Sequence, residues 1–126
     1  MSRQPFEYAV LRAIPRADRG EFVNVGVMLY CQARDFLAAL THVDADRLRA
    51  LDAAVDIPAI EAALGAIEAA CAGDPSVGPA AQGSPGERFR WLAAPRSTVV
   101  QPGPVHTGLT ADPARELEHL LVCLVL

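Results

Sequence analysis

Two polar side chains near the start of the sequence are placed where they could bind an anion. Arg12 supplies a guanidinium in one apolar stretch, and Asn24 supplies an amide within the next, EFVNVGVMLYC. Gly26 follows closely and would leave a gap where other residues carry a side chain. A guanidinium and an amide beside such a gap can receive a carboxylate, a phosphate or a backbone carbonyl. Arg12, Asn24 and Gly26 are therefore the first candidate site.

Alternation along this stretch predicts that the three residues share one face of a sheet. The apolar residues at every second position predict a buried face made of Val23, Val25, Val27, Leu29 and Cys31. The matching set on the preceding strand is Ala9, Leu11 and Ala13. The opposite face then holds Arg12, Asn24, Gly26 and Met28. Two interpretations stay open. One is a ligand or partner site. The other is a structural use, in which Arg12 and Asn24 satisfy each other or bind the backbone of a covering loop, and Gly26 marks a bulge or a tight crossing.

A wider set of polar residues could extend this site into a small active site. His106 with Glu21 and Arg12 could supply a general base and an anion clamp. Asn24 and Arg88 complete the set for an anionic or phosphorylated ligand, and an enzyme should bring Arg12, Arg88 and His106 into one concave pocket. Thr107 follows the histidine directly and adds a hydroxyl. The sequence contains no nucleophile elbow and no P-loop, so the enzyme hypothesis has no motif behind it.

Metal binding is not predicted. Glu116 and His119 have the Glu-x-x-His spacing of carboxylate-bridged metal sites, with Cys123 one turn later. Such a site needs a second copy and further carboxylates on facing helices, and the sequence has neither. We therefore expect no metal and no cofactor.

Nucleic-acid binding is also disfavoured. Arg88 and Arg90 alternate with Phe89 and Trp91, and such a group could stack a nucleotide base. However, the formal net charge is −4 at pH 7, whereas nucleic-acid binders usually carry net positive charge. The two aromatic side chains are better interpreted as anchors to the core.

Composition predicts one soluble domain over residues 1–126, because 52% of the residues are hydrophobic and 21% are charged. The three cysteines are far apart, which indicates reduced thiols and the cytoplasm. The longest apolar run, LLVCLVL, is too short to span a membrane. A helix there would be apolar on every side, so we expect it to be enclosed or covered by a protein partner or a second copy.

Local signals predict an α+β fold with a small antiparallel sheet and helices packed mainly on one face. The expected strands are residues 6–14, 21–31 and 36–43, followed by short extended segments at 97–101 and 105–109. Helices are expected after the capping residues Asp44, Asp56 and Asp112, with a short helix or turn at 86–95. The Gly/Pro-rich stretch at 73–86 is expected to be a mobile loop.

Two long stretches resemble the signatures of one bacterial family. YAVLRAIPRADRGEFVNVGVMLYC looks like the opening signature of the family catalogued as domain of unknown function 3037, and FRWLAAPRSTVVQPGPVHTGLTADP is similar to its second signature. The positions that match are Arg12, Pro15, Glu21, Asn24, Gly26, Arg88, Pro95, Thr98, His106, Thr107 and Gly108.

The resemblance supplies no established activity. Some members are encoded beside kinase-like proteins related to persistence toxins, which implies a partner role. Our leading hypothesis is therefore a non-enzymatic protein-interaction or accessory module. The alternative is a small enzyme acting on an anionic or phosphorylated ligand through its Arg/Asn/Glu/His cluster.

Overall fold

The computed structural model describes residues 2–96 and 98–126 and contains a five-stranded antiparallel sheet. The strands run in the order β3-β2-β1-β4, and β5 pairs with the other half of β1. Their bounds are Gln4–Ala13 for β1, Val23–Cys31 for β2, Phe36–Thr41 for β3, Val100–Pro102 for β4 and His106–Thr110 for β5. Segments from the two ends of the sequence thus meet on β1, the central strand.

The helices begin where the sequence predicts them. Their bounds are Ala45–Leu51 for α1, Ile57–Cys71 for α2, Pro85–Ala93 for α3 and Pro113–Leu124 for α4, with 3-10 turns at Gln32–Arg34 (η1) and Pro75–Ala81 (η2). A side chain caps each α-helix by accepting a backbone N–H, and the four caps are Asp44, Asp56, Ser84 and Asp112. Proline in the first turn of α2, α3 and α4 removes a donor that has no partner there.

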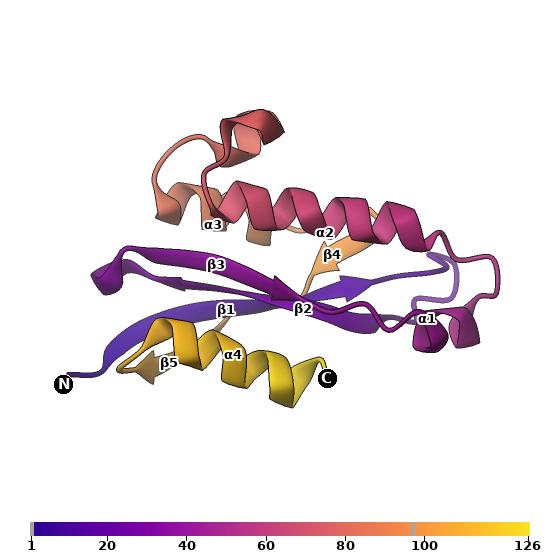
Figure 1. The fold of residues 1–126 in the computed structure, drawn as a ribbon, viewed down its shortest axis with the longest axis horizontal. Coiled ribbons are helices and arrows are strands. Elements are labelled where there is room, and N and C mark those ends of the chain that lie inside the picture. The colour runs from indigo at the N-terminus through magenta and orange to yellow at the C-terminus, as the bar shows by residue number, and fades with distance from the viewer. Residues whose placement is uncertain (1, 97) are drawn as a thin grey trace.

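The α+β class is confirmed, and the helices divide between the two faces of the sheet. In Figure 1, α2 and α3 lie above the sheet and α4 lies below it. Each face buries its own apolar cluster: Leu11, Val25 and Phe89 belong to the first, and Val27 and Leu117 to the second. The sheet is therefore the middle layer, with α4 as the helix on the second face.

A β-bulge in β2 decides which residues face each cluster. Leu11 pairs with Gly26, but the next residue, Arg12, pairs with Asn24, so Val25 is an extra residue on β2. Before the bulge, Val25 points toward α2 and α3; after it, Val27 points toward α4. The predicted single face from Val23 to Cys31 is therefore wrong, because alternation reverses at the bulge.

Gly26 lies on the α2 face and leaves no open space there. An added Cβ would lie 2.9 Å from the Leu40 carbonyl oxygen and 3.2 Å from Cδ1 of Leu11. The predicted gap beside Arg12 and Asn24 is thus wrong, and the interpretation of Gly26 as the mark of a bulge is correct. Glycine fits because the neighbouring strands approach too closely for a side chain.

The Gly/Pro-rich stretch includes the η2 turn and leads into α3. Asp74 caps η2 by accepting the backbone N–H of Ser76, and Ala81 is buried. The Arg88 guanidinium donates to the Gly83 carbonyl at 2.9 Å and to the Cys71 carbonyl at 3.1 Å. These bonds join α3 to the segment before it and to the end of α2.

Two glycine substitutions test the close approach of the strands. We expect Gly26→Ala to lower the free energy of unfolding by about 1–3 kcal/mol, because the new methyl group would be forced against the Leu40 carbonyl. The matched control is Gly65→Ala in α2, where an added Cβ meets nothing within 4 Å. This control should be neutral or stabilising by up to about 1 kcal/mol, because alanine favours a helix more than glycine does. Urea denaturation measures the free energy of unfolding of both variants and of the wild type. A Gly26→Ala variant as stable as Gly65→Ala would contradict the packing described for Gly26.

Candidate functional site

The candidate site is centred on Arg12, on the face of the sheet that carries α4. Arg12 pairs with Asn24 of β2 on one side and with Gln101 of β4 on the other, so the three side chains share a face. Its guanidinium carbon lies 4.3 Å from the centre of the Phe22 ring. It also packs against Gly103, where an added Cβ would lie 3.1 Å from that carbon. The guanidinium is thus positioned by an aromatic ring and by bare backbone.

A pocket of about 680 Å³ opens beside this guanidinium. It is formed at the junction of β1, β4 and the loop between β1 and β2, and its lining includes Arg12, Ile14, Phe22, Thr98, Gln101 and Pro102. Ile14, Phe22 and Pro102 are apolar, and Arg12 is the only charged residue of the lining within the described part of the chain. The pocket therefore combines one cationic group with apolar walls, a common composition for a binding site.

Arg12 differs from four of the other arginines because no carboxylate among the described residues pairs with it. Arg16, Arg19, Arg49 and Arg90 each pair with a carboxylate. For Arg12, neither an ion pair nor a side-chain hydrogen bond occurs among the described residues, and its Nε atom is buried without a partner. An unsatisfied buried donor costs about 1–3 kcal/mol, so an acceptor that reaches the Nε–H group would be stabilising.

Asn24 has a structural partner at the end of α4. Its Nδ2 donates to the Leu124 carbonyl at 3.0 Å, and Arg47 from α1 donates to the next carbonyl, Val125, at 3.3 Å. The last carbonyls of a helix lack partners within the helix, so these two side chains satisfy them. The structural interpretation therefore holds for the Asn24 Nδ2 group, while its Oδ1 is buried without a partner among residues 2–96 and 98–126.

His106 is on β5, on the same face of the sheet as Arg12, and it pairs with β1 at a point further along that strand. It pairs with Tyr8, and the centres of the two rings are 5.2 Å apart. Tyr8 and Arg12 are four residues apart on one strand, which corresponds to about 13 Å. Glu21 lies in the loop before β2 and is hydrogen-bonded to Arg19, which lowers the pKa of its carboxyl group. Neither group therefore lies directly against the Arg12 guanidinium.

The remaining predicted residues lie on the other face. Arg88 is bound to backbone carbonyls beneath α3, Gly26 is packed between strands, and Thr107 pairs with Glu7. The structure therefore brings together Arg12 and Asn24, with His106 on the same face, and separates them from Arg88 and Thr107. Arg12, Arg88 and His106 therefore do not lie in one pocket, as the enzyme hypothesis expects.

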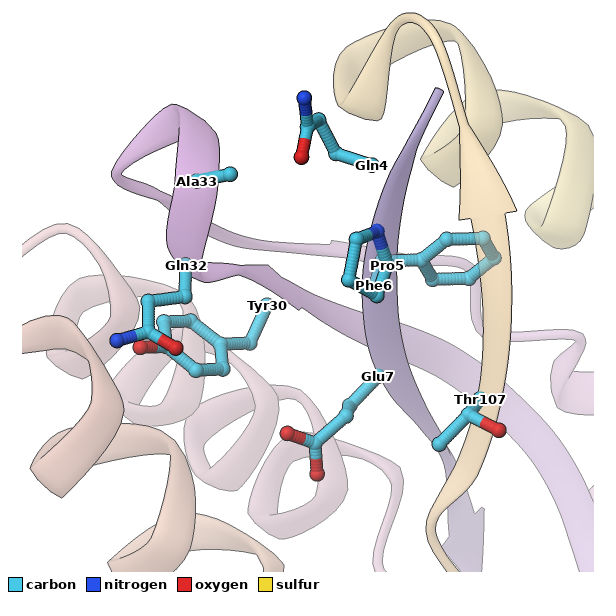
Figure 2. A pocket seen from close by; sticks show the side chains of 8 residues that line it. All are labelled: Gln4, Pro5, Phe6, Glu7, Tyr30, Gln32, Ala33 and Thr107. Atoms are coloured by element: carbon cyan, nitrogen blue, oxygen red, sulfur yellow. The ribbon is translucent and has the colours of Figure 1, made fainter. Parts of the chain in front are cut away.

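A second pocket, of about 560 Å³, lies on that other face near the start of β1 (Figure 2). Glu7, Tyr30, Gln32 and Thr107 are among its lining residues. The Glu7 carboxylate is already occupied, because Arg90 donates to both of its oxygens at 2.5 and 2.6 Å. Its charge is thus neutralised within the chain, which makes this pocket the weaker candidate.

The apolar tail is enclosed on one side by the sheet. Leu117 and Val125 are buried against β2 and β3, whereas Val122 and Leu126 are about 60% exposed, at 59% and 61%. Cys123 is exposed, with its sulfur 3.6 Å from Nε2 of His119. No group of three His, Cys, Asp or Glu side chains within residues 2–96 and 98–126 is arranged to hold a metal ion. None of the described helices is both long and apolar enough to cross a membrane.

Sequence reasoning missed two residues that position the guanidinium, Phe22 and Gly103. Phe22 precedes the apolar alternation of β2, which was a usable signal for a ring beside the site. Gly103 lies between two prolines and indicated only a break in the chain. Its contact with Arg12 depends on how β4 pairs with β1, and no local pattern reports that.

The structure is thus an α+β fold with a pocket that Arg12 lines. The chain belongs to the family described as "Protein of unknown function (DUF3037)", whose model matches residues 8–125. This match confirms the resemblance found in the sequence. No curated protein and no solved structure matches the chain significantly.

The Glu7–Arg90 ion pair predicts one component of the pH dependence of stability. The Arg90 hydrogen bond holds the pKa of the Glu7 carboxyl below the usual range for glutamate. Because the folded-state pKa is the lower one, the contribution is complete above the unfolded value and is lost as the pH falls through the folded value. We expect Glu7→Gln to lower the free energy of unfolding at pH 7 by about 0.5–1 kcal/mol, given the exposure of the pair.

Urea denaturation of the wild type and of Glu7→Gln at pH 7 and at pH 3 measures this contribution. The difference between them should be smaller at pH 3, because the contribution of the ion pair declines once the pH falls below the unfolded-state pKa of Glu7. Glu118→Gln, on an exposed position of α4, is the control and should leave stability unchanged at both pH values. A Glu7→Gln effect that is equally large at pH 3 would show that packing, and not charge, explains it.

Proposed function

We propose that this protein is a non-enzymatic interaction module that holds a partner protein through a carboxylate seated on Arg12. The observation that carries the proposal is the half-buried guanidinium, positioned by Phe22 and Gly103 beside a pocket with no matching carboxylate among the described residues. The cost of ordering this side chain is already met in the free protein, which favours binding.

The chemistry of the pocket favours a carboxylate over a phosphate. An arginine fork matches a carboxylate with two parallel hydrogen bonds, and a single cation balances its single charge. A phosphate carries more charge, and the lining offers one cationic side chain. The apolar walls formed by Ile14, Phe22 and Pro102 suit the hydrophobic residues that flank an acidic side chain or a carboxyl terminus in a partner.

The same features support an interaction role over catalysis. His106 lies about 13 Å along the strand, and Glu21 is already bound to Arg19. The free cysteines Cys31, Cys71 and Cys123 agree with a reducing cytoplasm. The family resemblance implies that some members are encoded beside kinase-like proteins. These kinase-like proteins are the first partners to test.

Affinity capture with purified protein tests this proposal. The wild type, Arg12→Gln, Gly103→Ala and Arg115→Gln are immobilised, and bound proteins are quantified by mass spectrometry, with a kinase-like neighbour as the defined candidate. Arg12→Gln should weaken a genuine partner about 10- to 100-fold, because it removes the charge that faces the partner carboxylate. Gly103→Ala keeps that charge but displaces the guanidinium, and it should weaken the same partner.

Arg115→Gln is the matched control, because it removes an arginine from the exposed side of α4. It should retain the partner at the wild-type level. Thermal unfolding establishes that each variant is folded before binding is compared. A partner that binds the wild type and folded Arg12→Gln equally would contradict the proposal, as would a wild type that captures no specific protein.

A further inference from the structure

Strand β3 forms one edge of the sheet, and some of its backbone N–H and C=O groups are not paired with another strand of the described residues. It pairs with β2 over its whole length, and none of the strands in the described residues pairs with its other side. His42 donates to Val25 just beyond β3, so by alternation Leu40 and Ala38 also face β2. The N–H and C=O groups of Leu37, Ala39 and Thr41 therefore point away from the sheet.

This edge lacks the usual protection against pairing with another strand. The sequence of β3, FLAALT, contains no charge and no proline. The opposite edge differs, because Pro102, Gly103 and Pro104 interrupt it between β4 and β5. Proline and irregular backbone discourage strand addition. The edge of β3 is therefore the one better suited to accept a further strand.

The charges beside β3 indicate which side chains an added strand would carry. Figure 1 shows β3 between α2 and α4. On the α2 side, exposed Glu68 accepts a hydrogen bond from Thr41, and exposed Glu61 joins it in lining a pocket of about 450 Å³ next to the end of β3. The two glutamates lie two turns apart on α2, or about 10 Å. A strand added to β3 would place every second side chain below these carboxylates.

A second copy of the chain is a poor occupant for this edge. Pairing β3 with its own copy about a two-fold axis would place the α2 helices side by side, with Glu61 and Glu68 near the same residues of the copy. Like charges at such an interface are unfavourable. A strand bearing Lys or Arg on the α2 side would instead be attracted.

We propose that the edge of β3 binds an extended segment of a partner protein in which basic and apolar residues alternate. The backbone of the segment pairs with the outward groups of Leu37, Ala39 and Thr41. Its basic side chains point toward Glu61 and Glu68, and its apolar side chains pack beside Phe36, Ala38 and Leu40, which are half-buried on the α4 face. This mode of binding takes affinity from main-chain hydrogen bonds and specificity from alternate side chains.

The inference goes beyond the Arg12 site and is independent of it. Arg12 lies on β1, and β2 separates β1 from β3. The two surfaces also select opposite charges, since Arg12 favours an acidic group and the β3 edge a basic one. Loss of one interaction should leave the other intact.

The probe is a capped seven-residue peptide of alternating valine and lysine, titrated into the ¹⁵N-labelled full chain. We expect shifts of the amide signals of Leu37, Ala39 and Thr41, with little change at Arg12. Glu61→Gln and Glu68→Gln should each weaken binding about two- to fivefold. Glu118→Gln on α4 is the matched control and should bind the peptide like the wild type.

Two further peptides separate strand pairing from simple charge attraction. A peptide that is N-methylated on the face toward β3 keeps its charges but loses its donors, and should bind at least about tenfold more weakly. A valine–glutamate peptide should not bind detectably. The proposal would be overturned if the N-methylated peptide bound as tightly as the unmethylated one, or if both glutamine variants bound the peptide as tightly as the wild type. Amide signals that shift only outside β3 would also overturn it. So would a wild-type dimer in solution whose interface is the β3 edge.

Discussion

One extra residue in β2 determines how the rest of the molecule is arranged. Because Val25 is inserted opposite the step from Leu11 to Arg12, the first part of β2 contributes its valines to the cluster under α2 and α3. The second part contributes Val27 and Leu29 to the cluster over α4. A regular strand with this sequence would bury only one face, so the bulge lets one central strand support helices on both sides.

The bulge also explains the polar residue and the glycine that interrupt this strand. Two consecutive residues, Val25 and Gly26, face α2, and the second has no room for a side chain against Leu40. Asn24 is turned to the other face, where its amide binds the end of α4. The N-terminal hairpin thereby holds the C-terminal helix, and Arg47 of α1 reinforces the contact.

The same arrangement leaves two surfaces of opposite chemical character. The pocket beside Arg12 presents a positioned cation among apolar walls. The free edge of β3 presents backbone groups below the carboxylates of Glu61 and Glu68. These surfaces lie on different strands, because β2 separates β1 from β3.

The sequence by itself determined the elements, because their signals are local. Aspartate caps followed by proline or apolar periodicity located α1, α2 and α4 within a few residues, and alternating apolar residues located β1, β2 and β3. It also indicated that Arg12 and Asn24 are neighbours, which the pairing of β1 with β2 bears out. Capping and alternation depend only on residues close together in the chain, so the sequence alone predicts these elements.

Only the tertiary structure decided the roles of the polar residues. Arg88 matches the family signature as well as Arg12 does, yet it binds the carbonyls of Cys71 and Gly83 on the far side of the sheet. The position of the bulge, the contact of Gly103 with Arg12 and the capping of α4 by Asn24 all join segments distant in sequence. Their energies depend on which strands and helices come together, so a single sequence cannot report them. Packing on both faces of the sheet fixed these roles, because most buried polar groups of a folded protein take their hydrogen-bond partners from the elements packed around them.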